Sequence, residues 1–213
     1  MTFAELKKRV DNAARTRGAR GEEITIVVVS KGQSAEAINN LAAQGAKIFG
    51  ESRLQEALLK LPLFTNVQLH FIGRLQSNKV KKITELFTMI QSVDSLSIAR
   101  QIDNAARECG KVQEVLLQVN NSGEKQKGGI AKEYFAALYE DVVKLSNISV
   151  KGLMMIPPHF DNPEKNRLLF RDMFNIYTSC NLPYLSMGMS GDFETAVEEG
   201  ANMVRVGSAL FER

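Results

Sequence analysis

Eight short apolar runs alternate with amphipathic stretches along the chain, and this alternation restricts the possible folds more than any other feature. The runs cover residues 24–29, 46–50, 67–73, 88–93, 112–120, 149–156, 183–187 and 202–207. The stretches between them carry helical spacing, as in 34–45 and 95–110, which both end in glycine. Eight strand–helix units predict a closed (β/α)8 barrel, the TIM-barrel class of α/β fold. A doubly wound open sheet is the alternative if the shortest runs are not strands.

Length and composition favour one barrel domain over residues 1–213, beginning with an amphipathic helix over residues 1–18. The chain has 213 residues, 44% of them hydrophobic and 24% charged. No apolar stretch approaches the ~20 residues that cross a bilayer, and the first helix lacks the apolar centre of a signal peptide. A net charge of +3 is too small to indicate nucleic-acid binding. The two cysteines match no metal spacing. We therefore expect a cytoplasmic monomer with no metal, nucleic-acid or membrane partner.

Mainly polar residues lie at or near the carboxyl ends of the predicted strands, where chemistry collects in this fold. In chain order they are Lys31, Glu51, Arg74, Asp94, Asn120, Met154, Ser190 and Arg205–Ser208. Lys31 follows the buried run "ITIVVV". A lone lysine there could simply reach solvent, but its place in this ring favours an amine presented to a ligand. We expect Lys31 to be partly buried.

Two neighbouring motifs, "LSMGMSGD" and "MVRVGSALF", predict an anion site. Each is a strand followed by a Gly/Ser turn that opens a helix, where backbone N–H groups and hydroxyls bind anions. Ser190 and Gly207–Ser208 fall after strands 7 and 8, the usual phosphate position in such barrels. Ser190 as a simple N-cap of the helix over 190–200 is the alternative. The pair of motifs favours a phosphate-bearing ligand.

Arg205 and His70 lie within predicted strands rather than after them. Arg205 alternates with Val204 and Val206, which directs it to the barrel interior or mouth. An arginine there needs an acceptor, either a ligand or an inner acid such as Glu51. His70 in "LHFIG" is open to two interpretations, a core residue or a ligand neighbour.

Seven blocks together resemble the pyridoxal phosphate homeostasis protein family of the YggS/PROSC type. They are "VVVSKG", "FGESRLQEA", "HFIGRLQSNKVK", "SVDSLSIA", "QVNNSGEKQKGG", "GLMMIPP" and "LSMGMSGDFETAVEEGANMVRVGSALF", in this order over nearly the whole chain. The resemblance implies a barrel similar to the N-terminal domain of alanine racemase. It also implies that Lys31 holds pyridoxal 5′-phosphate (PLP) as an internal aldimine.

The resemblance assigns further residues to the cofactor. Ser190, Gly207 and Ser208 would bind the phosphate, and Arg205 would face the pyridine nitrogen. His70, Ile72 and Met154 would lie close to the ring. Ser52 stands where the family has asparagine, in "GESRLQE" for the usual "GENYVQE". Gly191 likewise replaces an acid of the family motif.

The implied role is cofactor homeostasis without established enzymatic turnover, with apo-enzymes as transient partners. An arginine at the pyridine nitrogen makes the ring a poorer electron sink than a carboxylate does, which agrees with a carrier. The alternatives are an amino-acid racemase-like enzyme, a cofactor-free Schiff-base aldolase and a pure interaction protein. The visible spectrum of the purified protein distinguishes these classes.

Overall fold

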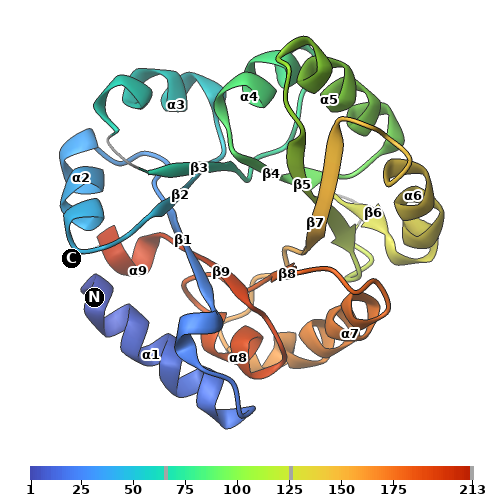
Figure 1. Cartoon of the computed structure of the whole chain (residues 1–213). Coiled ribbons are helices and arrows are strands. Elements are labelled where there is room, and N and C mark those ends of the chain that lie inside the picture. The colour runs from blue at the N-terminus through green and yellow to red at the C-terminus, as the bar shows by residue number, and fades with distance from the viewer. Residues whose placement is uncertain (65–66, 125–126, 212–213) are drawn as a thin grey trace.

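The computed structural model describes residues 1–64, 67–124 and 127–211, and they form a closed ring of eight parallel strands (Figure 1). Every strand pairs with its neighbour in parallel, and the pairing of the fourth strand with the fifth completes the ring. The barrel prediction is therefore confirmed, and the open-sheet alternative is wrong. The strands are β1 Thr25–Val29, β2 Ile48–Glu51, β3 Gln68–Phe71, β4 Met89–Val93, β5 Gln113–Asn120, β7 Ile148–Met154, β8 Tyr184–Ser186 and β9 Met203–Val206.

One additional strand, β6 (Ile130–Ala131), was not predicted. It pairs in parallel with the last two residues of β5 and lies outside the ring. Two residues are too few to show any periodicity in the sequence. Residues 125–126 of the motif "QVNNSGEKQKGG" and residues 212–213 of the predicted domain lie outside the described part of the chain.

Helices surround the barrel on the outside (Figure 1). Ser34 and Ser95 cap two of them, each hydroxyl accepting from the backbone N–H three residues on. No helix in the described ranges has the length and apolar character needed to cross a membrane. The helices are α1 Phe3–Thr16, α2 Ala35–Ala43, α3 Leu54–Lys60, α4 Val80–Leu86, α5 Leu96–Glu108, α6 Phe135–Val142, α7 Arg167–Thr178, α8 Phe193–Glu198 and α9 Ser208–Phe211.

The first helix, α1, covers the barrel beside α8, where the first and last strands of the ring meet (Figure 1). A capping box of Thr2 and Glu5 fixes its start. Arg9 Nε donates to Glu194 Oε1 at 2.9 Å, and the Arg9 guanidinium lies over the ring of Phe193. These contacts attach α1 to the C-terminal part of the chain.

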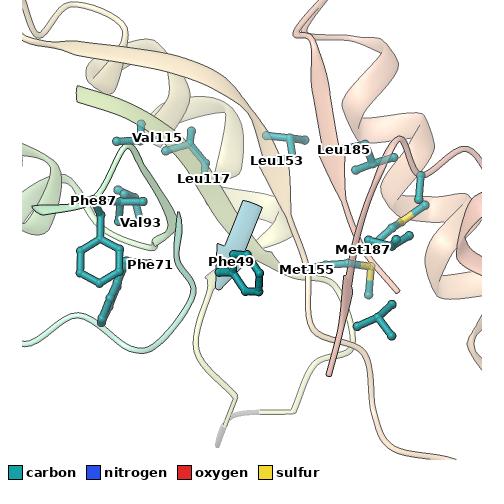
Figure 2. Packing of buried hydrophobic residues seen from close by; sticks show 14 of the residues in the cluster. Phe49, Phe71, Phe87, Val93, Val115, Leu117, Leu153, Met155, Leu185 and Met187 are labelled. Atoms are coloured by element: carbon teal, nitrogen blue, oxygen red, sulfur yellow. The ribbon is translucent and has the colours of Figure 1, made fainter. Parts of the chain in front are cut away.

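The hydrophobic residues form two separate buried clusters. The larger lies between strands and helices, and Figure 2 shows part of it, including Phe71 edge-on to Phe87 with centroids 5.2 Å apart. The smaller cluster joins five different strands and therefore fills the barrel interior. Its members are Val27, Met89, Leu116, Met154 and Met203. Closely packed apolar side chains thus form one layer inside the barrel.

Candidate functional site

A cleft of about 630 Å³ opens among the segments that follow β1, β2, β3, β7, β8 and β9. This is the carboxyl end of the barrel, as expected for a site in this fold. Seven of the nine predicted site residues line the cleft: Lys31, Ser52, Ile72, Ser190, Arg205, Gly207 and Ser208. The closed barrel brings these seven residues together although they are up to 177 positions apart.

Lys31 occupies the turn directly after β1, and its side chain is exposed rather than partly buried as expected. Hydrogen bonds hold the turn on both sides of this lysine. Ser30 N–H donates to the Gly50 carbonyl at 3.1 Å, and Gly32 N–H donates to Glu56 Oε2 at 2.9 Å. The backbone is therefore fixed while the amine is free to reach into the cleft.

A buried ion pair lies directly behind the Lys31 turn. Lys60 Nζ lies 2.8 Å from Glu51 Oε1 and also donates to the Ser30 carbonyl at 2.7 Å. Ser30 Oγ donates to the same Glu51 oxygen at 2.7 Å. Glu51 therefore pairs with Lys60, and the alternative that it partners Arg205 is wrong. The sequence carried no signal for Lys60, which is the last residue of an ordinary amphipathic helix.

Ser190 joins the two anion-site motifs but does not cap the helix that follows it. Its Oγ accepts from Gly207 N–H at 3.1 Å and Ala209 N–H at 3.4 Å, both in the other motif. Helix α8 begins only at Phe193, so the predicted cap at Ser190 is wrong. Within the described residues no acceptor takes the Ser190 O–H, which leaves that proton to donate to a ligand.

Arg205 is 3% exposed and yet forms part of the cleft wall. Its Nη1 donates to Ser186 Oγ at 2.7 Å and its Nη2 to the Met155 carbonyl at 2.8 Å. Among the residues described, no carboxylate forms a direct ion pair with it, although the charge of Asp192 favours its charged form. Burial lowers the pKa of Arg205 to about 10, so it is still a cation at neutral pH. Alternation with Val204 and Val206 correctly predicted its inward direction.

The remaining two predicted site residues, His70 and Met154, do not line the cleft. Met154 belongs to the apolar cluster inside the barrel. His70 is 3% exposed, and its Nδ1 lies 2.9 Å from Gln91 Nε2. Burial lowers the pKa of His70 to about 4, so the ring is neutral at physiological pH. Both are interior residues because period-2 alternation in β3 and β7 directs them into the barrel.

The loop between β7 and α7 forms a wall that sequence reasoning missed. Pro158, His159 and Phe160 line the cleft, and His159 is exposed there. Asn166 Nδ2 donates to the Pro158 carbonyl at 3.1 Å and to Asp192 Oδ2 at 2.9 Å. The loop is thereby tied to the segment after β8. Only its place after a strand could have indicated this wall.

The chemistry of the lining suits an anionic, aldehyde-bearing ring. Lys31 provides an amine, Arg205 a guanidinium, and Ser52, Ser190 and Ser208 provide hydroxyls. Asp192 contributes the one carboxylate of the described lining, and its two oxygens already accept from Met189 N–H and Asn166. A Cβ at Gly191 would meet no atom within 4 Å, so there is open space beside Ser190. No group of three metal-binding side chains occurs in the part of the chain that is described.

The fold and the cleft define the class of protein: a (β/α)8 barrel with a lysine in the cleft at its carboxyl end. Residues 3–212 match the family model of the alanine racemase N-terminal domain. More specifically, the chain is 41% identical over 218 residues to the pyridoxal phosphate homeostasis protein of Aquifex aeolicus (strain VF5). The match covers 98% of this chain and 95% of that protein. The chain belongs to the pyridoxal phosphate homeostasis protein family.

Solved structures agree with this assignment. PipY of Synechococcus elongatus PCC7942, solved with PLP bound, has a TM-score of 0.83 and 32% sequence identity, covering 95% of this chain and 99% of PipY. Alanine racemase of Clostridium difficile 630 has a TM-score of 0.73 at 17% identity, covering 97% of this chain but 56% of the racemase. The racemase therefore shares only the barrel fold.

Proposed function

We propose that this protein binds PLP in the cleft at the carboxyl end of its barrel and serves PLP homeostasis without turning over a substrate. The convergence of Lys31, Arg205 and Ser190 on one cleft is the observation that carries this proposal. Relatives named for PLP homeostasis, and PipY with PLP bound, support it. We further propose that residues 1–213 form a single domain that acts as a monomer in the cytoplasm. There it would pass PLP to apo-enzymes.

The chemistry of several lining residues supports a role for each of them toward PLP. PLP supplies an aldehyde that an amine can attack, and Lys31 Nζ is the amine that the structure presents in the cleft. Ser190 donates its free O–H to the phosphate, assisted by Ser208 and by the space at Gly191. Arg205 would donate an N–H to an unprotonated pyridine nitrogen. Ser52 and Ile72, which also line the cleft, would lie beside the ring.

Lys31 is tested by replacing it with alanine. The wild-type protein should show a visible absorption band with PLP that borohydride bleaches, and Lys31→Ala should lack that band. Lys47→Ala is the control, because Lys47 is exposed. Lys60→Ala would be a poor control, because it breaks a buried ion pair. Peptide mapping after borohydride should find the pyridoxyl group on Lys31. A label mainly on another lysine would show that the assignment is wrong.

Racemase-like turnover is the second candidate, and one observation favours it. Racemisation needs proton carriers on both faces of the α-carbon, and exposed His159 lines the same cleft as Lys31. None of the tyrosines belongs to the described lining. The carrier function proposed above predicts the opposite result: holo-protein incubated with L-alanine in D2O should show no enzymatic exchange of the α-proton by NMR. Exchange at ~1 s⁻¹ or faster that disappears in His159→Asn would establish catalysis instead.

A further inference from the structure

Four buried polar side chains cross the interior of the barrel in a single row. His70 of β3, Gln91 of β4, Ser186 of β8 and Arg205 of β9 are each no more than 3% exposed. Polar groups at such depth destabilise a fold unless each finds a partner. Each of the four has at least one hydrogen-bond partner within the row. The row lies above the apolar cluster that contains Met89 and Met203, two positions before Gln91 and Arg205 on the same strands.

Every hydrogen bond in the row runs in the same direction. Arg205 Nη1 donates to Ser186 Oγ at 2.7 Å, and Ser186 Oγ donates to Gln91 Oε1 at 2.7 Å. Gln91 Nε2 then lies 2.9 Å from His70 Nδ1. An amide nitrogen can only donate, so Nδ1 must accept and the imidazole proton must be on Nε2. The low pKa of His70 agrees with this neutral ring.

Two hydrogen bonds orient the guanidinium of Arg205, but neither acceptor carries a negative charge. Ser186 Oγ and the Met155 carbonyl accept from Nη1 and Nη2, and both acceptors are neutral. A guanidinium has five N–H donors in one rigid plane, so these two bonds orient the donors that remain. No carboxylate pairs directly with Arg205 in the described residues, and Asp192 of the cleft wall acts on its charge only through a longer-range interaction. The positive charge thus faces the cleft, and the two hydrogen bonds fix the orientation of the guanidinium.

We propose that Ser186, Gln91 and His70 are positioning residues that hold the guanidinium of Arg205 in place for a neutral ring nitrogen in the cleft. This inference rests on the proposed function. His70 would thus act on Arg205 through Gln91 and Ser186, without touching the cofactor. The positioning role also explains why the barrel interior contains a buried glutamine and serine instead of further apolar side chains.

The direction of the row is tested without any cofactor. Nitrogen-15 NMR of the cofactor-free protein should show His70 as the neutral tautomer protonated on Nε2. The chain has two histidines, so His159→Gln assigns the signals. A ring protonated on Nδ1, or a charged imidazolium at pH 7, would reverse or break the row and overturn the inference.

The effect on the ligand is tested with Gln91→Leu, with Gln113→Leu as the matched control. Gln113 is an equally buried strand glutamine, but its amide bonds only to backbone carbonyls of Thr88 and Glu114. Gln91→Leu should raise the dissociation constants of PLP and of unphosphorylated pyridoxal by the same factor, about tenfold, because both ligands carry the ring nitrogen. Gln113→Leu should leave both constants at wild-type values.

The outcomes separate this inference from the proposed function. If Gln91→Leu binds both ligands as tightly as Gln113→Leu does, the positioning role is wrong while PLP binding stands. If the wild-type protein forms no bleachable band, the proposed function itself fails. Should Gln91→Leu not fold, Ser186→Ala breaks the same row by removing one oxygen atom. Ser186→Ala is expected to weaken the binding of both ligands equally, and unchanged binding would again show that the positioning role is wrong.

Discussion

Lys60 is a buried lysine, and its removal would leave the buried carboxylate of Glu51 without a counter-charge. Its partner Glu51 is fully buried, and the Glu51 Oε2 has no hydrogen-bond partner in the described residues. Lys60→Met should therefore destabilise the fold by about 3–5 kcal/mol, because a carboxylate is left unpaired in the core. Denaturant unfolding at pH 7 measures the change in the free energy of unfolding.

The double variant Glu51→Leu/Lys60→Met is the matched control for this prediction. It removes both charges, so most of the lost stability should return. The Ser30 carbonyl would still lack its donor, which leaves a smaller deficit. If the double variant were less stable than Lys60→Met, the uncompensated charge could not be the cause of the loss.

Ser190 is expected to distinguish a phosphorylated ligand from an unphosphorylated one. Ser190→Ala should weaken PLP binding by about 1.5–3 kcal/mol through loss of a charge-assisted hydrogen bond, with a much smaller effect on pyridoxal. Equilibrium titration of both ligands measures this difference. The hydroxyl also accepts from Gly207 N–H, so some loss common to both ligands is expected. Equal losses for the two ligands would contradict a phosphate role.

At the scale of elements, the end of α8 depends on a glycine that allows no side chain. Gly200 has φ +107°, and a Cβ there would lie 2.2 Å from Cδ2 of Phe174 on α7. Gly200→Ala should cost about 2–4 kcal/mol through backbone strain and displacement of that ring. Thermal or denaturant unfolding measures this loss.

The corresponding position after α5 supplies the control. Gly110 also has a positive φ, +65°, but a Cβ there would meet no atom within 4 Å. Gly110→Ala should therefore cost only about 1 kcal/mol, the backbone term alone. Similar losses for the two variants would mean that the contact with Phe174 does not contribute.

The eight barrel strands could be predicted because unbroken apolar and β-branched runs such as 24–29 are typical of buried strands. The cleft could be predicted in outline because the carboxyl ends of barrel strands converge. Contacts between distant elements could not be predicted. Nothing near Ser190 indicates that it accepts from Gly207, and nothing in α3 indicates that Lys60 reaches Ser30. The sequence left His70 open between two interpretations, because its hydrogen-bond partner Gln91 lies on another strand.

At the scale of the whole molecule, burial of His70 makes stability depend on pH. Its pKa is about 4 in the folded protein against 6.5 for the free side chain, so between these values the unfolded chain binds the proton and the folded chain does not. Stability therefore falls as the pH is lowered from about 6.5 to about 4, by up to about 3 kcal/mol from this group.

Urea unfolding at pH 7 and at pH 4.5 measures this dependence. His70→Gln, which cannot be protonated, should lose less stability between the two pH values than the wild-type protein does. His159→Gln is the control because His159 is exposed, and it should behave as the wild type. An unchanged pH dependence in His70→Gln would show that other groups are responsible.

The pairing of β1 with β9 also has a consequence for how the protein is made. β1 leaves the ribosome long before β9, which is one of its two neighbours in the ring. At 5–20 residues per second, the wait between them is on the order of ten seconds or more. During that time one edge of an apolar strand has no partner and can pair with another chain. Premature termination before residue 203 would leave that edge open permanently, so truncated products should aggregate rather than accumulate as smaller barrels.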